Sequence, residues 1–555
     1  MSNLNNDSQE QVKTNKAVKP LNRIDKFFGI TERGSNFKTE IVAGIVTFLA
    51  MCYILTVNPN QFFYAGTANP QWTSVFIATA FGAIIGTLLM AFLSKLPLAQ
   101  ASGMGLNSLV GSVIGGGVGA YAYSFSFSLA NALFMILISG ILFLLLSIIT
   151  VKGVSLRQKI FEGIPAAIRT AIPVGIGLFI AYIGFQNAGV IITDGFTQID
   201  VIDFTKWGEQ LKQWGQLTPI KEAFLENGTP ITGAFDSLGN PITGALLQGS
   251  AVYVTTQSAI VCLIGLFVIA ILDHCKIKGS VIIGILVATL VGIPLGVTDL
   301  AVVTGNVDGI SWKFWENFAD YFGPNGVFAL PFTEGWNLPA GSIMTAIMLI
   351  ITFCMVDMFD TMGTCVGCCS AAGLMDKNGV PLNYGKIMYA DSIATCTGAI
   401  FGTSTVTTFV ESGAGIATGG KTGFASVITA IMFFLAIFAL PVFAMIPSAA
   451  TASALVYVGV LMMKNIKNVD FSDIRTAIPA FLAIAIMPLG YSITKGIGWA
   501  ILSYVIISIF CYVIDLIKYA CSKAEGKQKP TWNVSVVTLI IALLFVVYFF
   551  VPTVL

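Results

Sequence analysis

The sequence predicts an all-α polytopic membrane protein with about fourteen transmembrane segments in two inverted repeats of seven. Hydrophobic residues make up 55% of the 555 residues and charged residues 10%, and apolar runs of membrane-spanning length recur along the chain. The basic residues gather in short loops that fall on one side of the membrane. Two glycine-rich stretches interrupt the apolar pattern at matching places in the two halves.

The first half opens with a polar tail and a basic amphipathic stretch at 1–40, which we expect on the cytoplasmic side. Its ordinary helices are expected at 41–57, 74–93, 129–150, 164–184, 258–272 and 279–291. The stretch ASGMGLNSL, which begins at Ala101, is too short and glycine-rich for a spanning helix, so we expect a short extended piece followed by a half-helix. Residues 193–249 are polar and rich in turn signals, and they predict an aqueous insert.

The second half follows an aromatic, polar insert at 299–338. Its ordinary helices are expected at 342–371, 387–401, 422–443, 446–463, 477–493 and 497–517. The stretch 403–421, TSTVTTFVESGAGIATGGK, changes from a β-branched run to small residues, which indicates a second extended piece with a half-helix. A last apolar run at 534–551 is either an extra span or an interfacial helix. With the tail inside, the basic loops are cytoplasmic and both inserts are outside, with Lys495 as an exception.

An internal repeat accompanies this map. The sequence IPAAIRTA at 164 is echoed by IPSAATAS at 446, and the broken stretch at 101 is echoed by the one at 403. Each offset is seven spans, and an odd offset inverts the second half relative to the first. Inverted repeats with broken helices at matching positions are typical of secondary transporters, whose sites lie at the midplane where the breaks meet.

Acidic residues inside apolar segments are the chemical anomaly of the chain. Asp360 lies in the middle of the expected helix 342–371 with Asp357 one turn before it, and Glu411 precedes the second half-helix. Ionisable groups at membrane depth are costly, so they usually face a cavity or a partner. A role in helix packing or capping is the alternative, and it is most open for Asp357.

These residues predict one polar site. Asn107 and Glu411 occupy comparable positions on the two halves, and Asp360 approaches them from its helix. Two carboxylates and a carboxamide suit a flat heterocycle with alternating N–H and C=O edges. Phe359 and Phe409 adjoin the two acids and either stack on such a ring or pack in the core.

Proton coupling follows from the same placement. Burial disfavours a charged carboxylate, so one acid can take up a proton outside and release it inside. We expect Asp360 to carry the proton and Glu411 to hold the base edge, as an interacting pair. Thr364, at i+4 from Asp360, is expected to hydrogen-bond it across one turn.

Other classes of protein lack the residues they need. Cys365, Cys368 and Cys369 lie in a helix of small residues, and the single histidine, His274, is distant, so packing is favoured over a metal site. We therefore expect no catalytic residue, no metal, no cofactor and, with a net charge of +1, no nucleic acid partner. An ion channel would need a continuous lined pore rather than broken helices at one site.

Three motifs carry a resemblance to a known family. They are GMGLN at 103–107, VDMFDTMGT at 356–364 and TSTVTTFVESGAGIATGGKTG at 403–423, and the opening FFGITERGSNFKTEIVAGIVTFLAMCYILTVNP agrees with them. The chain resembles the nucleobase–cation symporters of the adenine/guanine/hypoxanthine permease branch, purine permeases related to uracil and xanthine permeases. Ser102 departs from the proline expected in the first motif.

The resemblance implies a purine importer of the plasma membrane (the cell inner membrane), commonly a homodimer, that works by an elevator-like motion in symport with protons or sodium. Asp360 and Glu411 are implied to hold the base, with Asn107 at the polar position of the first broken stretch. The implied parts are a core domain at 41–152 and 342–445, a gate domain at 153–295 and 446–520, an extracellular insert at 296–341 and a C-terminal tail at 521–555.

The substrate remains open within this architecture. The preferred purine depends on one or two contacts, and a transporter of uracil, xanthine or an inorganic anion such as sulfate or bicarbonate is the alternative. An anion is disfavoured because the broken stretches and the helix that carries Asp360 contain no basic residue before Lys421.

Overall fold

The computed structural model shows a mostly helical protein of the multi-span membrane class. Eight helices among the described residues are long and apolar enough to cross a membrane. The structure describes residues 22–63, 69–114, 127–151, 154–155, 157, 164–192, 200–202, 204–205, 210–213, 252–277, 279–300, 303, 310–324, 326–375, 381–490, 493–521, 531–532 and 534–550. The predictions for the N-terminal tail and most of the insert at 193–249 lie outside these residues.

Helices of the first half begin and end close to the expected residues. They are α2 (Phe37–Met51), α3 (Ile54–Phe62), α4 (Trp72–Leu89) with its π-helical end η2 (Met90–Ser94), α5 (Met104–Val113), α6 (Leu129–Ile148), α8 (Ala166–Asn187), α9 (Thr256–His274) and α10 (Ser280–Gly292). The first span starts four residues before the predicted position because the Asn36 side chain accepts a hydrogen bond from the Thr39 amide and caps it.

Helices of the second half also follow the apolar pattern. They are α13 (Ile343–Ala371), α14 (Tyr384–Phe401), α15 (Ser412–Ala417), α16 (Gly423–Ile437), α17 (Leu440–Ala444), α18 (Ser448–Met463) with the 3-10 turn η5 (Lys464–Asn468), α19 (Ile474–Leu489), α20 (Ile493–Cys521) and α21 (Val536–Phe550). The last apolar run of the sequence is thus a helix of 15 residues, α21, that packs against α20.

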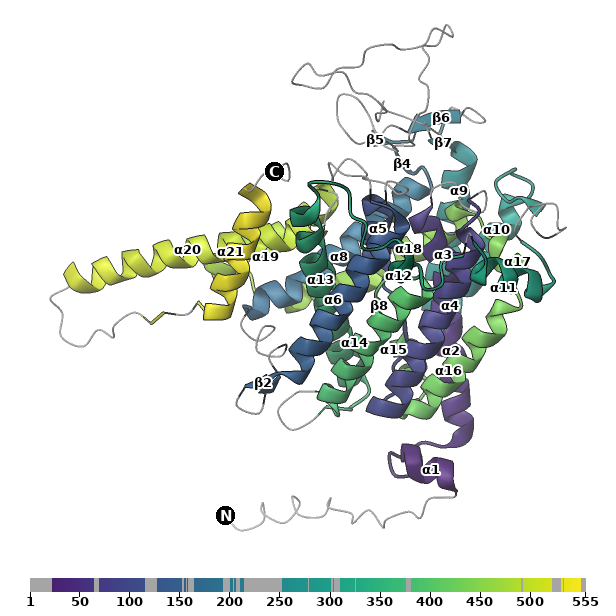
Figure 1. The fold of residues 1–555 in the computed structure, drawn as a ribbon, viewed down its shortest axis with the longest axis horizontal. Helices are drawn as coiled ribbons and strands as arrows, with labels where there is room; N and C mark the ends of the chain where they lie inside the picture. Colours follow the sequence, from purple (N-terminus) through teal and green to yellow (C-terminus); the bar gives the residue numbers. More distant parts are fainter. Residues whose placement is uncertain are drawn as a thin grey trace, which may run out of the picture.

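Several short elements accompany the long helices, and Figure 1 shows α1 and β2 at one end of the bundle and β4 to β7 at the other. They are the helices α1 (Arg23–Phe28), α11 (Phe314–Phe322) and α12 (Leu330–Thr333) and the strand pairs β2 (Thr150–Val151) with β3 (Val154–Ser155), β4 (Ile191–Ile192) with β5 (Asp200–Val201), and β6 (Gln210–Gln213) with β7 (Val252–Thr255). The Tyr321 hydroxyl of α11 donates to the Phe401 carbonyl at 2.7 Å, so the second insert covers the end of α14.

Two short strands from opposite halves of the chain cross at the centre of the bundle. β1 (Gln100–Ser102) leads into α5, and β8 (Val406–Thr408) leads into α15, and the two strands pair antiparallel. The pairing is extended by a bond from the Gly103 amide to the Thr405 carbonyl and by one from the Phe409 amide to the Ala99 carbonyl, both 3.0 Å. Extended backbone at membrane depth must find such partners, because lipid offers none.

The helices pack in two groups around this crossing. In one group α4 contacts α14 and α16, α2 contacts α16, and α6 contacts α13 and α14. In the other, α8 contacts α18 and α19, and α9 contacts α10 and α18. Figure 1 shows α20 and α21 extending to one side of the bundle.

Glycines on the helices of the first group let the strand β8 approach closely. A Cβ at Gly398 of α14 would lie 2.6 Å from Cγ2 of Val406 and 3.0 Å from the Ser404 carbonyl oxygen. A Cβ at Gly86 of α4 would lie 2.7 Å from Cγ1 of the same valine. Both helices therefore touch β8 with bare backbone.

We expect Gly398→Ala to lower the free energy of unfolding by about 1–3 kcal/mol, because the added methyl overpacks the strand. Gly385→Ala is the matched control on the same helix, since a Cβ there meets no atom within 4 Å. Thermal unfolding of the purified protein in detergent measures both variants. Equal melting temperatures for the two would show that β8 can shift without cost.

Candidate functional site

A narrow pocket opens beside the strand crossing. Its polar side comes from α13, β8 and the start of α15, and its other side comes from α8 and α18. Asp360, Thr364, Thr407 and Glu411 supply the polar groups of its lining. Phe409, Ile180, Val458 and Met462 supply apolar side chains. The cavity holds only about 30 Å³. A cavity of that size has room for water but not for a larger ligand, so a larger ligand requires the two sides to separate.

Glu411 is held from one side by a tyrosine of the first span. The Tyr53 hydroxyl donates to Oε1 of Glu411 at 2.5 Å and also lies 3.4 Å from Sδ of Met104. Tyr53 sits at the break between α2 and α3. The other carboxylate oxygen, Oε2, is buried and has no hydrogen-bond partner within the described part of the chain. Glu411 therefore has one oxygen fixed and one free to accept a donor.

Asp360 is the more open of the two acids. It is partly exposed, and its Oδ2 accepts a hydrogen bond from the Thr407 hydroxyl at 3.2 Å. Thr364 lines the same pocket one turn along α13. Among the described residues, the hydroxyl that donates to Asp360 is therefore that of Thr407, and not that of Thr364 as the i+4 spacing predicts.

Asn107 lies behind the pocket rather than in its lining. Its Oδ1 accepts hydrogen bonds from the hydroxyls of Ser102, at 2.6 Å, and Ser404. These serines come from the two crossing chain segments and lie 2.6 Å from each other. Ser102, which stands where the motif has a proline, thus links the two crossing segments through its hydroxyl. Phe359 is 2% exposed and outside the lining, whereas Phe409 lines the pocket.

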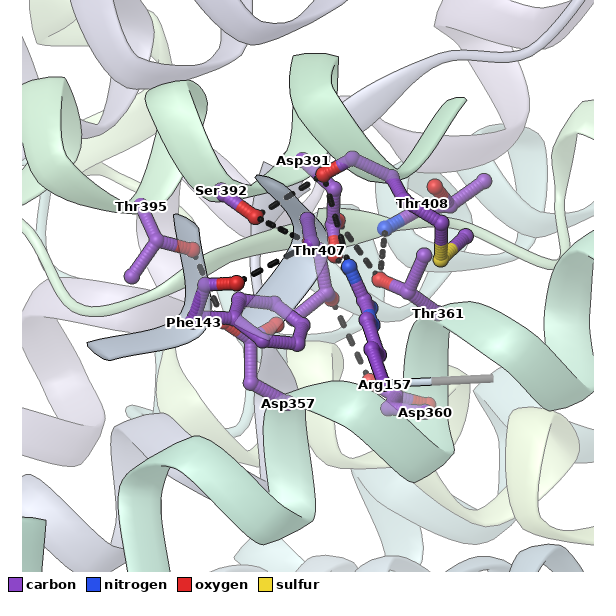
Figure 2. Close-up of polar contacts among 12 residues, drawn as sticks. Phe143, Arg157, Asp357, Asp360, Thr361, Asp391, Ser392, Thr395, Thr407 and Thr408 are labelled. Atoms are coloured by element: carbon purple, nitrogen blue, oxygen red, sulfur yellow. Dashed lines mark hydrogen bonds and ion pairs between the residues drawn. The ribbon is translucent and has the colours of Figure 1, made fainter. Parts of the chain in front are cut away.

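Two further acids lie behind Asp360. Asp357 is fully buried, and its Oδ2 accepts a hydrogen bond from Thr395 of α14 at 2.8 Å. Asp391, also on α14 and fully buried, forms an ion pair of 3.0 Å with Arg157, which comes from the connection between α6 and α8 (Figure 2).

Tyr53, Asp391 and Arg157 were not among the site residues predicted from the sequence. Asp391 carried a usable signal, because it is an acid inside an apolar helix, like Asp360. Tyr53 and Arg157 carried none, because their partners lie 358 and 234 residues away along the chain.

Metal-binding groups are lacking in the ranges that the structure describes, where no three His, Cys, Asp or Glu side chains are arranged to hold an ion. Cys365, Cys368 and Cys369 are free and buried, and His274 is exposed at the end of α9. The pocket chemistry therefore rests on carboxylates and hydroxyls. Such a set accepts N–H donors from a polar, flat ligand.

Comparisons with known proteins agree over most of the chain. The model of the Permease family matches residues 38–205 and 235–498. A permease of Methanocaldococcus jannaschii is 34% identical over 94% of this chain and 98% of its own. The adenine permease AdeP of Escherichia coli is 30% identical, over 88% of this chain and 90% of its own. The guanine/hypoxanthine permease PbuG of Bacillus subtilis is 31% identical, over 86% and 92%.

A solved structure shares the fold. The transmembrane domain of a cyanobacterium bicarbonate transporter, BicA, aligns with a TM-score of 0.51 over 84% of this chain and 97% of that domain. At 14% identity, this likeness concerns the fold alone.

We expect Tyr53→Phe to lower the free energy of unfolding by about 1–3 kcal/mol, because it leaves the buried Glu411 carboxylate without its donor. Tyr321→Phe is the control, since it removes a hydroxyl that donates to the neutral Phe401 carbonyl, for which about 0.5–1.5 kcal/mol is expected. Thermal unfolding of Tyr53→Phe, Glu411→Gln and the double variant measures the coupling. Strictly additive effects would mean that the two side chains do not interact.

Proposed function

The chain belongs to the Permease family of nucleobase transporters, and from this premise we propose that it imports the purine bases hypoxanthine, guanine and adenine in symport with protons. It is a multi-pass membrane transporter and not an enzyme. Relatives named as adenine permease and as guanine/hypoxanthine permease match it at similar identity, 30% and 31%. The proposal therefore includes all three bases.

One observation carries the proposal. Glu411 lines the same pocket as Asp360, and its buried Oε2 has no hydrogen-bond partner in the part of the chain that the structure describes. An unpaired carboxylate oxygen in a buried position is costly, and a ligand N–H removes that cost. Purine bases carry N–H groups on more than one edge, so a single ring can reach both acids. Phe409 lines the same pocket and offers a ring for stacking.

The coupling proton is assigned to the same pocket. A second ionised acid beside Glu411 would add charge to a site that water scarcely reaches, and such charge is unfavourable. We assign the proton to Asp360, whose carboxyl is the more open of the two, and the base edge to Glu411. Binding of a neutral base together with a proton leaves the site less charged on its way across the membrane.

The proposed motion follows from the packing. The fourteen expected segments would form two inverted repeats whose broken members are β1 with α5 and β8 with α15. The group that contains α13 and the strand crossing would move as the core, and the group that contains α8 and α18 would act as the gate. Because the present cavity of about 30 Å³ is too small for a purine, the two groups must separate to load it. Membership of this family favours a homodimer in the plasma membrane with a cytoplasmic N-terminus.

An inorganic anion fits the pocket less well. The structure brings Arg157 near the acids, but its guanidinium binds Asp391 and the Met388 carbonyl rather than the pocket. Two carboxylates without a facing cation repel an anion.

The direct test is uptake of radiolabelled adenine, guanine and hypoxanthine into cells that lack purine transport. We expect saturable uptake that rises as the outside pH falls, since the proton is a co-substrate. Uracil and xanthine serve as competitors, and sodium is varied at constant pH. If uptake depends on sodium instead of pH, sodium replaces the proton as the coupling ion. If none of the three purines is taken up, the proposed function is overturned.

Two substitutions separate the roles of the acids. Asp360→Asn cannot carry a proton, so its uptake is expected to lose its dependence on outside pH. Glu411→Gln weakens a charge-assisted hydrogen bond worth about 1.5–3 kcal/mol, so its KM is expected to rise about 10-fold to 100-fold with the pH dependence kept.

Glu316→Gln is the control for both, because Glu316 is an exposed acid paired with Lys313 on the surface. It is expected to behave like wild type. If loss of pH dependence appears in Glu411→Gln instead, the two acids exchange roles. If both variants transport like wild type at normal abundance, the base binds elsewhere.

A further inference from the structure

We propose that Arg157 is a positioning residue for the base site and acts on Asp360 through Asp391. The inference rests on the proposed function, because it assigns a role in the same site. Arg157 comes from the connection between α6 and α8, outside every segment that the motifs single out. Its side chain is nevertheless completely buried at the back of the acidic pocket.

The guanidinium of Arg157 is held on three sides. Its Nη2 lies 3.0 Å from Oδ2 of Asp391, and its Nη1 donates to the Met388 carbonyl at 3.4 Å. Its central carbon lies 3.5 Å from the centre of the Phe143 ring, a cation–π contact. Asp391 is also 0% exposed. A buried charge is retained only with such partners, so neither member of the pair is free to leave alone.

Asp391 uses its other oxygen to hold two elements of the site. Its Oδ1 accepts hydrogen bonds from Nε2 of Gln100 at 2.9 Å and from the Thr361 hydroxyl at 2.7 Å. Gln100 belongs to β1. Thr361, which Figure 2 shows beside Asp391, belongs to α13. All three groups that face this carboxylate are donors, which matches an ionised acid that only accepts. Arg157 supplies the charge that balances it.

Thr361 connects Asp391 to the strand that lines the pocket. Its hydroxyl accepts the Thr408 amide at 3.3 Å, while the preceding residue, Asp360, accepts the Thr407 hydroxyl at 3.2 Å. Two consecutive residues of α13 are thus fastened to two consecutive residues of β8. The orientation of the Asp360 carboxyl depends on this double contact, and the double contact depends on Asp391.

The contacts run from Arg157 to Asp391, then to Thr361, and from there to the turn of α13 that carries Asp360. No atom of Arg157 reaches the pocket, so its effect on the base is indirect. Removal of the guanidinium leaves a buried carboxylate that must find a proton or another donor. A protonated Asp391 would compete as a donor with the Thr361 hydroxyl and loosen the contact with β8.

The test compares uptake kinetics of wild type, Arg157→Gln, Arg157→Lys, Asp391→Asn and the double variant Arg157→Gln with Asp391→Asn. We expect Arg157→Gln to raise the KM for the preferred base at least tenfold, with Vmax per transporter changed less than threefold. Arg157→Lys keeps the charge and is expected to recover part of the KM. The double variant removes both charges, so neither of the two is left unpaired. It is expected to recover abundance in the membrane while its KM stays raised, because the charged anchor is still absent.

The exposed pair of Asp473 and Arg475 provides the control, since its side chains are 39% and 43% exposed and lie away from the pocket. Arg475→Gln is expected to keep the wild-type KM. If Arg157→Gln does not reach the membrane, the double variant decides: restored abundance with a raised KM supports the inference, and restored abundance with the wild-type KM overturns it. Wild-type kinetics in Arg157→Gln also overturn it. Purine uptake by wild type is scored separately, so failure of the proposed function is recognised by its own result.

Discussion

The pairing of β1 with β8 is the constraint on which the rest of the structure depends. Two broken segments leave unpaired amide and carbonyl groups at membrane depth, and each strand supplies the partners that the other lacks. Glycines of α4 and α14 make room for the pair, and Ser102, Ser404 and Asn107 fasten it with hydrogen bonds. Because the strands are fixed in this way, Thr407, Thr408 and the following Glu411 are placed against α13. The position of the pocket therefore follows from the backbone hydrogen bonds between the two strands.

Each acid around this crossing has a different partner, and the partner sets what the acid can do. Asp391 binds a cation and serves as an anchor, and Asp357 binds the Thr395 hydroxyl in the interior. Asp360 accepts a hydrogen bond from the Thr407 hydroxyl of β8 and lines the pocket, while Glu411, among the described residues, is bound through one oxygen, by the Tyr53 hydroxyl. The two acids with spare acceptor capacity at the pocket are therefore the ones suited to a ligand.

Hydropathy predicted most of the long helices, because a spanning segment must be apolar along its whole length. It did not show the breaks that divide the helices expected at 41–57 and 422–443 into α2 and α3 and into α16 and α17. It placed the helix that begins at Ile343 within one residue, and it missed the start of α2 by four residues because a polar cap lies outside the apolar run. The motifs also indicated Asp360 and Glu411, which line one pocket. The roles of Tyr53 and Arg157 could not be predicted, since no local pattern reveals a partner hundreds of residues away. The broken stretches and the helix of Asp360 carry no basic residue before Lys421, and Arg157 comes instead from the connection between α6 and α8.

In the proposed site, the preference for one base over another depends on whether Asp360 carries the coupling proton. An ionised carboxylate accepts an N–H, whereas a protonated one also donates, so the protonation state of Asp360 decides which edge of a purine it can face. The amino group of adenine suits an acceptor at that position, and the carbonyl oxygen of hypoxanthine or guanine suits a donor. The hydroxyls of Thr364 and Thr407 both donate and accept, so they do not discriminate between these edges. A neutral carboxyl, which donates and accepts, can pair with a donor–acceptor edge of any of these bases, whereas an ionised carboxylate suits the adjacent N–H groups of guanine, so a proton on Asp360 changes which edges are favoured. The anchor formed by Asp391 and Arg157 would hold this carboxyl in position in either state.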